Sequence, residues 1–187
     1  MASLKCSSEG GIPLIEAGIR PLVSFGGLTE LELLSPCTPE RCSIQLNDSI
    51  ISALSMALPR LTSLSLGSAP CRAATSDVTV ASLVALSTNC VDLDFLQLHF
   101  NANDITTRCS HENPRTHKFT CKLRTLSVGS QPLPSNYNDI LLITFTILHI
   151  FPHLEAISSQ AGYWEEVEEV VRLFREAPKI FPFLTAN

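Results

Sequence analysis

The sequence predicts an α/β fold: a short solenoid of about five stacked units, with a curved parallel sheet and helices on its convex side. Three observations support this prediction. A leucine motif recurs at a nearly constant interval, helix-forming stretches separate several of its copies, and the chain is 45% apolar but only 17% charged. Such a composition excludes a disordered chain and requires extensive burial.

The recurring motif is Leu-x-x-Leu-x-Leu. Its copies begin at residues 28, 61, 93, 123 and 154, so successive copies are 33, 32, 30 and 31 residues apart. The fourth copy ends in Val128, and the fifth, LEAISS, is a degenerate version. One such motif arises easily by chance, whereas five at this spacing indicate a repeat. The alternative is an unrelated α/β sheet whose strands happen to be rich in leucine.

Each motif is read as a short strand. Side chains alternate along a strand, so the last two leucines of a motif point to the core. The residues directly before, between and after these two leucines point to the opposite face. Because helices are bulkier than strands, that face should be concave and open to a partner. The residues predicted to contact the partner are Glu30, Glu32, Ser63, Ser65, Phe95, Gln97, His99, Thr125 and Ser127. Phe95 is the candidate aromatic anchor, unless a neighbouring loop covers it, and His99 fits a partner contact and a solvated histidine equally well.

Helix signals lie between the motifs. Asn47 and the two residues after it can cap a helix that runs to Leu58. A second helix begins at Asp77 or Thr79, and a third begins at residues 138–139. The third is apolar almost all round, so we expect it to be buried on most sides. Residues 101–120 are polar and contain Pro114, which indicates a loop or at best a short helix.

A final helix is predicted from about residue 164 to 176, with Pro178 after its end. Its apolar face comprises Trp164, Val167, Val170, Val171 and Phe174. The glutamates at 165–169 could suggest paired catalytic carboxylates. They fit better as the solvated side of a capping helix, because the terminal unit of a stack needs a polar outer side.

The repeat resembles the leucine-rich repeat, and Cys90-xx-Leu93-xx-Leu96-x-Leu98 resembles its cysteine-containing type. From about residue 21 to 179 the chain also resembles the C-terminal repeat region of fungal F-box proteins. The stretches that support this are FGGLTELELLSP, ISALSMALPRLTSLSLGSAPC, VTVASLVALSTNCVDLDFLQLHF and the terminal YWEEVEEVVRLF. In that family the repeats bind the protein to be ubiquitinated, and an F-box docks on the Skp adaptor of a cullin–RING ubiquitin ligase. The resemblance therefore implies a protein-interaction module that recognises ligase clients.

We expect a poorly structured segment over residues 1–20 and a leucine-rich-repeat domain over residues 21–187. The 20 residues before Pro21 do not contain an F-box. A Skp-type adaptor is therefore expected as a partner only if an F-box lies upstream. The alternative is a truncated or orphan repeat protein with only a structural or scaffold role.

Two cysteines and two histidines raise the alternative of a zinc site. Cys109, His111, His117 and Cys121 lie within thirteen residues, and zinc binds such ligands tetrahedrally. The first pair is separated by one residue, closer than the usual two to four, so the competing interpretation is a polar loop with a buried thiol. The chain shows no nucleophile elbow and no phosphate-binding loop, so we predict neither an enzyme nor a cofactor.

Charge and cysteine content restrict the partners and the compartment. The net charge is −5 and the 13 basic residues are scattered, which argues against nucleic acid and anionic membranes. The longest apolar run, residues 140–151, is shorter than the roughly 20 residues that cross a bilayer. Seven cysteines without a framework spacing indicate reduced thiols of a cytoplasmic or nuclear protein.

Overall fold

The computed structural model describes residues 2–7, 20–34, 46–67, 76–108, 119–129, 133, 136–159 and 164–180. The strands in these residues are β1 (Ser3–Ser7), β2 (Glu30–Leu34), β3 (Ser63–Leu66), β4 (Phe95–Leu98), β5 (Thr125–Val128) and β6 (Ala156–Ser159). The α-helices are α2 (Asp48–Ala57), α3 (Val80–Asn89), α4 (Asn103–Arg108), α5 (Tyr137–Ile150) and α6 (Glu165–Ile180), and a 3₁₀ helix, η1, spans Arg20–Ser24.

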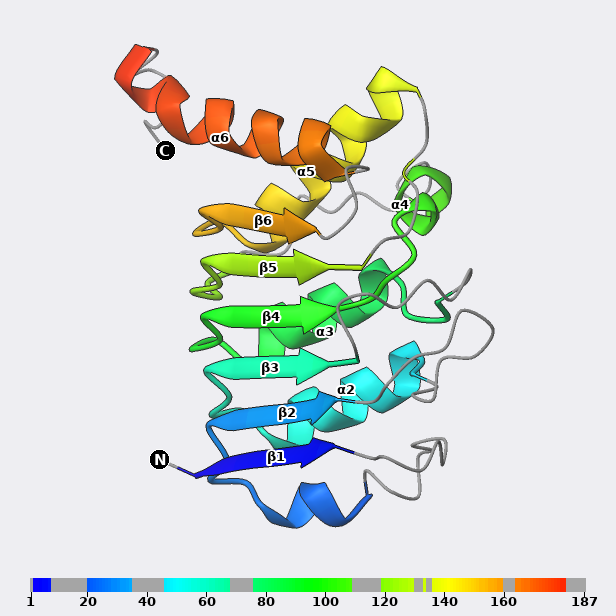
Figure 1. Ribbon diagram of the computed structural model, residues 1–187, viewed down its shortest axis with the longest axis vertical. Coiled ribbons are helices and arrows are strands. Elements are labelled where there is room, and N and C mark those ends of the chain that lie inside the picture. The colour runs from blue at the N-terminus through cyan, green and yellow to red at the C-terminus, as the bar shows by residue number, and fades with distance from the viewer. Residues whose placement is uncertain are drawn as a thin grey trace.

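The six strands form one parallel sheet in chain order, β1-β2-β3-β4-β5-β6. Figure 1 shows them stacked from the N-terminal to the C-terminal end, with α2 and α3 behind the sheet and α6 across the end beyond β6. The motifs lie in register, because Leu31 pairs with Leu64, Leu64 with Leu96, and so on to Leu126 and Ile157. The predicted α/β architecture with a parallel sheet is therefore confirmed.

The same connector leads from helix to strand in three of the units. Each helix ends at a buried cap residue whose N–H donates to the carbonyl four residues earlier. The first leucine of the next motif then donates its N–H to the carbonyl of that cap residue. The three pairs are Leu61 to Leu58 at 3.2 Å, Leu93 to Cys90 at 3.1 Å, and Leu154 to Phe151 at 3.1 Å. The apolar residue three positions before the motif is thus the end of the helix and part of the core.

The helices begin at capping residues. The side chain of Asn47 accepts from the N–H of Ile50 at 2.9 Å, and Thr79 accepts from Ala81, so Thr79 rather than Asp77 caps α3. Asp77 instead forms a parallel bridge with Asn47. Helix α5 is capped by Asn136 and therefore starts slightly before the position predicted from the sequence.

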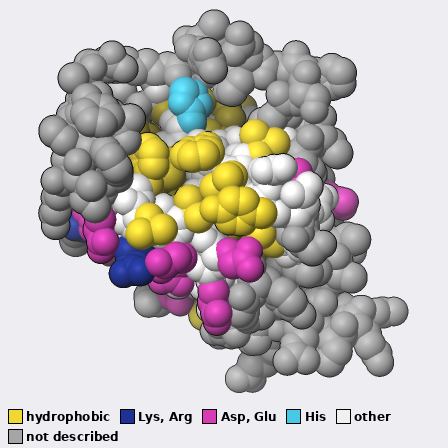
Figure 2. Space-filling view, turned by 90° about the horizontal axis from the view of Figure 1, so that it is seen from above, with side chains coloured by type: hydrophobic (Ala, Val, Ile, Leu, Met, Phe, Trp, Pro, Cys, Tyr) yellow, Lys and Arg dark blue, Asp and Glu magenta, His cyan; other side chains and the backbone are white. Residues whose placement is uncertain are grey.

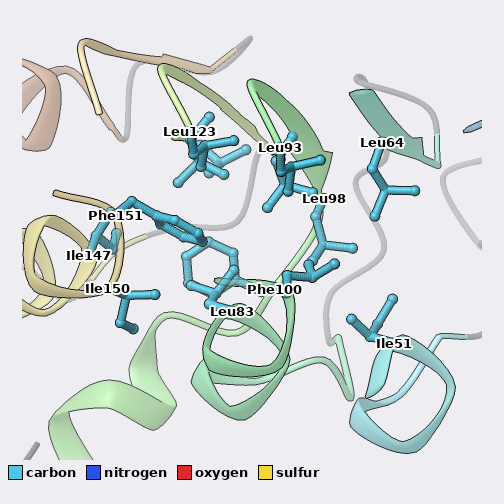
Figure 3. Packing of buried hydrophobic residues seen from close by; sticks show 14 of the residues in the cluster. Ile51, Leu64, Leu83, Leu93, Leu98, Phe100, Leu123, Ile147, Ile150 and Phe151 are labelled. Atoms are coloured by element: carbon cyan, nitrogen blue, oxygen red, sulfur yellow. The ribbon is translucent and has the colours of Figure 1, made fainter. Parts of the chain in front are cut away.

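The core lies between the sheet and the helices behind it. Figure 3 shows strand-side leucines such as Leu64, Leu93 and Leu98 meeting Ile51 and Leu83 from the helices. All of these side chains are fully buried. One strand and its helix supply only half of such a layer, so each unit depends on its neighbours for burial.

The structure corrects the prediction at the N-terminus. Residues 3–7, expected to be poorly structured, form β1, which pairs with β2 from Ser3 to Ser7. This strand has no leucine motif, which is why the sequence did not reveal it. Its main-chain groups instead hydrogen-bond to the edge of β2, and that contribution requires no particular side chains.

The C-terminal helices also differ from expectation. Helix α5 contacts α3, α4 and α6 but leaves Leu142 and Phe145 exposed, so it is buried on fewer sides than its apolar sequence predicted. Helix α6 continues to Ile180, past Pro178. Only two helical residues follow Pro178, so the hydrogen bond that its missing N–H removes lies in the last turn of the helix. Phe174, expected on the buried face of this helix, is exposed.

The polar stretch after β4 begins with the short helix α4, consistent with one of the two alternatives for residues 101–120. Among the described residues, none of the helices has both the length and the apolar character needed to cross a lipid bilayer.

Candidate functional site

The candidate site is the sheet face that turns away from the helices, called the open face below. In Figure 1 it is the near face of the sheet, and no described helix lies in front of it. Its side chains alternate with the buried leucines, as the burial patterns of β2, β4 and β5 show. Strand register arranges them in two rows: Glu30, Ser63, Phe95, Thr125 and Ala156, then Glu32, Ser65, Gln97, Ser127 and Ser158.

Phe95 stands at the centre of the first row. Its neighbours in register are Ser63 on β3 and Thr125 on β5, both much smaller than a phenyl ring. Adjacent strands are about 4.8 Å apart, so the ring rises above short hydroxyl side chains on both sides. The ring is half-buried, which leaves part of it accessible. The rows in these strands contain this one aromatic residue, and it is the position most suited to anchoring a partner.

The N-terminal end of the open face is acidic. Glu30 and Glu32 lie two residues apart on β2, on the same face of the strand, and both are half-buried. The main chain of Lys5 on β1 is in register with Glu32. The open face thus changes from carboxylates at β2 to hydroxyl groups at β5 and β6.

Charged residues also line the edge where the strands begin, and they pair with one another. Lys122 contacts Asp92 at 2.7 Å, and Arg124 forms two hydrogen bonds to Asp94. The hydrogen bond from Arg124 holds the pKa of Asp94 below its usual value, and the bond to Asp92 raises the pKa of Lys122. All four side chains are about half exposed or more. Ion pairs of this kind contribute little to stability.

Two predicted contact residues, Gln97 in β4 and His99 just after it, contact other parts of the protein. The side-chain amide of Gln97 donates to the carbonyl oxygen of Gly67 in the preceding unit at 3.1 Å. The ring of His99 lies against Gly129, so closely that a Cβ there would come within 2.3 Å of its Nδ1. A larger residue at position 129 would clash with the His99 ring, although the backbone conformation there would allow one. Both Gln97 and His99 are half-buried.

Most of the residues predicted to contact a partner have accessible side chains on the open face, but one is almost fully covered. Glu30, Glu32, Ser63, Thr125 and Ser127 are accessible on the open face. Ser65 is only 7% exposed and offers little surface to a partner. Ala156 and Ser158 were missed, although the degenerate fifth motif has the same alternation that identified the other rows.

One of the four candidate zinc ligands, Cys121, lies in the described part of the chain. Cys109, His111 and His117 lie outside the described residues. Cys121 is fully buried, and its thiol lies 3.5 Å from the carbonyl oxygen of Cys90 and 3.8 Å from that of Leu93. The residues described here contain no group of three or more His, Cys, Asp or Glu side chains placed to hold a metal ion.

Cys121 and Cys90 instead link neighbouring units. The Cys90 thiol lies 3.5 Å from the carbonyl oxygen of Leu58, just as Cys121 lies near that of Cys90. Burial raises the pKa of Cys121, and burial together with the proximity of Cys121 raises the pKa of Cys90 to about 12. Metal binding requires the thiolate, so these environments favour a structural thiol.

Apolar residues on the outer side of α5 and α6 form a second surface that the sequence did not predict. Both helices were expected to turn their large apolar side chains inward, and periodicity alone gives no sign that the packing leaves some of them uncovered.

Comparison of the chain with protein-family models gives no match, and no curated protein matches it significantly.

Proposed function

We propose that this chain is a non-catalytic protein-interaction module, a leucine-rich-repeat solenoid of the cysteine-containing type that binds a partner protein on its open face. The repeat type is supported by the constant spacing of the motifs and by strands paired in chain order with their leucines in register. The thiol-to-carbonyl contacts of Cys90 and Cys121 between successive units also fit a cysteine-containing repeat. Helices wider than strands make such a stack curve toward its sheet, so the open face becomes concave.

The main support for binding is the placement of Phe95. Phe95 is only half-buried between Ser63 and Thr125, and its ring is not needed to fill the core, because the leucines on the other side of the sheet are already fully buried. Aromatic residues surrounded by small polar ones are typical of interaction hot spots. The carboxylate of Glu30 favours a partner segment that places a basic residue beside β2 and an apolar residue over β4.

The resemblance to the repeat region of F-box proteins supports a ubiquitin-ligase client as the partner class. It does not alter the chemistry of the face, which would recognise its partner through Phe95 and the surrounding polar residues. The partner is therefore defined here by surface chemistry: a polypeptide segment with an apolar anchor and a nearby cation.

Site-specific photocrosslinking tests the proposal. A photoreactive phenylalanine analogue at position 95 should crosslink a protein from a cell extract, and the Gln97→Ala variant should weaken that capture. The same analogue at Met56, which is 63% exposed on α2 away from the open face, is the matched control. Capture of the same protein with equal efficiency from positions 95 and 56 would contradict the proposal. So would the absence of capture at position 95 in a variant that unfolds at the wild-type temperature.

A further inference from the structure

The C-terminal end of the molecule presents a second surface, distinct from the open face. Figure 2 shows hydrophobic side chains gathered there over α5 and α6, with acidic side chains beside them. Four large apolar residues make up this end patch: Leu142 (37% exposed), Phe145 (48%), Leu173 (52%) and Phe174 (42%). Contiguous apolar surface with a polar border is typical of an interaction site rather than of a solvated cap.

The end patch is additional to the core. Val167 and Val171 of α6, and Trp164 just before the helix, are already buried against the rest of the molecule. Phe174 lies at the edge of this buried side, two turns after Val167, and meets Phe145 of α5 edge to face, with ring centroids 6.0 Å apart and planes at 75°. The contact fixes the two rings relative to each other, yet each keeps nearly half of its surface exposed. They form a preorganised aromatic pair facing outward.

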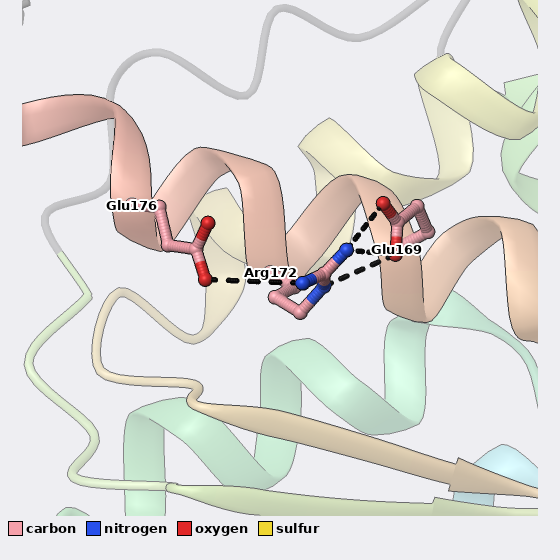
Figure 4. A network of polar contacts seen from close by, with 3 residues as sticks. All are labelled: Glu169, Arg172 and Glu176. Atoms are coloured by element: carbon pink, nitrogen blue, oxygen red, sulfur yellow. Dashed lines mark hydrogen bonds and ion pairs between the residues drawn. The ribbon is translucent and has the colours of Figure 1, made fainter. Parts of the chain in front are cut away.

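The described part of α6 that borders the end patch is negatively charged. Helix α6 places Glu165, Glu166, Glu168, Glu169 and Glu176 on its exposed side. Its two described arginines are already engaged. Figure 4 shows Arg172 between Glu169 and Glu176, at 2.6 Å and 4.0 Å. Arg175 turns inward and donates to the main-chain carbonyls of Leu154 and Pro152.

We infer that the end patch binds a basic amphipathic segment of a partner protein, with apolar side chains over Phe145 and Phe174 and lysines or arginines beside the glutamates. The charge selects this occupant. A second copy of the chain would bring glutamates against glutamates on a molecule of net charge −5, and an anionic membrane would be repelled in the same way. A segment with one apolar and one basic side matches both properties of the surface.

A defined peptide tests the inference. The probe is a fluorescently labelled helical peptide of leucine and lysine with its leucines on one face, and binding is measured by fluorescence anisotropy. We expect saturable binding that weakens as salt rises from about 50 mM to about 500 mM. Phe145→Gln and Phe174→Gln should each weaken it at least about tenfold. Glu166→Gln together with Glu165→Gln should weaken it by a smaller factor.

Matched controls separate this site from general charge attraction. Met56→Gln removes an apolar side chain from α2 that is more exposed than either phenylalanine, and Phe95→Ala alters the open face, so neither should change the affinity. A peptide with the same lysines and with serine in place of leucine should not bind saturably. Equal binding by wild type, Phe145→Gln and Phe174→Gln, with all three shown to be folded by circular dichroism, would overturn the inference.

Two further outcomes would assign the end patch to another occupant. If the chain dimerises in sedimentation equilibrium and Phe145→Gln makes it monomeric, the end patch binds a second copy and the inference is wrong. The same holds if wild type floats with phosphatidylserine vesicles and Phe174→Gln does not. We expect a monomer that does not float.

Discussion

At the scale of single residues, the leucines of the middle strands determine stability. Leu96 on β4 is fully buried between Leu64 and Leu126, which are its partners in register. Leu96→Ala should lower the free energy of unfolding by about 2–5 kcal/mol through lost burial and the cavity left behind. Urea denaturation followed by circular dichroism measures this. The control, Met56→Ala at an exposed site, should change it by less than about 0.5 kcal/mol, and equal losses in the two variants would contradict the assigned packing.

The burial of the Cys90 and Cys121 thiols leads to a second prediction at the scale of single residues. Because the folded-state pKa of Cys90 is about 12, above its ordinary value of 9.0, the folded protein retains the proton that the unfolded chain loses. This contribution to stability is complete below about pH 9 and declines as the pH rises toward 12. At pH 8, Cys90 and Cys121 should react with a thiol reagent only as fast as the chain unfolds.

The measurement uses a variant in which the other cysteines, residues 6, 37, 42, 71 and 109, are serine. Its two remaining thiols should label rapidly in urea and very slowly in buffer. Labelling in buffer at the rate of a free cysteine would show that these thiols are accessible and that the contacts between units are not formed.

The side-chain direction of each strand residue could be predicted from sequence, but its accessibility could not. Alternation along β2 correctly predicted that Leu31 and Leu33 are buried and that Glu30 and Glu32 lie on the other face. It could not show that Ser65 is nearly covered or that Gln97 reaches the carbonyl of Gly67, because both depend on neighbouring units. The position of His99 against Gly129 likewise joins residues of two different units.

At the scale of elements, Asp48 connects two successive helices. Located in the first turn of α2, its carboxylate accepts from the N–H of Thr79 at 2.7 Å and from the hydroxyls of Thr79 and Ser82 at 2.6 Å each. It thereby binds the N-terminus of α3, where a negative charge also interacts favourably with the helix dipole. Asp48→Ala should reduce the free energy of unfolding by about 1.5–3 kcal/mol.

Denaturant melts again provide the test, with Asp92→Ala as the matched control. Asp92 pairs with Lys122 on the exposed edge of the sheet, so its loss should cost less than about 1 kcal/mol. An Asp48→Ala variant as stable as the control would mean that the junction between α2 and α3 does not depend on these hydrogen bonds.

Helices were predicted most accurately where a capping residue marks their start. Asn47 and Thr79 were identified as candidate caps because a side-chain oxygen before an apolar stretch satisfies the first free N–H groups. The exposed side of α5 could not be predicted, since its sequence is apolar almost all round and only the neighbouring elements decide which side is covered. The end patch was missed for this reason.

At the scale of the whole molecule, the repeat period predicted the order of the strands. Units of nearly constant length, each unable to bury its own apolar side, stack in chain order, and the parallel sheet follows. The period could not predict β1, because that strand adds to the edge of β2 without a motif. The two proposed binding surfaces occupy different parts of the stack, the sheet face and its C-terminal end.

The account depends most on the parallel, in-register pairing of β3, β4 and β5, which places Phe95 between Ser63 and Thr125. Methyl-resolved NMR on a leucine-labelled sample tests this pairing directly. Directly paired residues on adjacent strands are closer than diagonal ones, so we expect the strongest cross-strand contacts between Leu64 and Leu96 and between Leu66 and Leu98. Antiparallel pairing would instead join Leu64 to Leu98 and Leu66 to Leu96, and observing that pattern would contradict the fold and the open face derived from it.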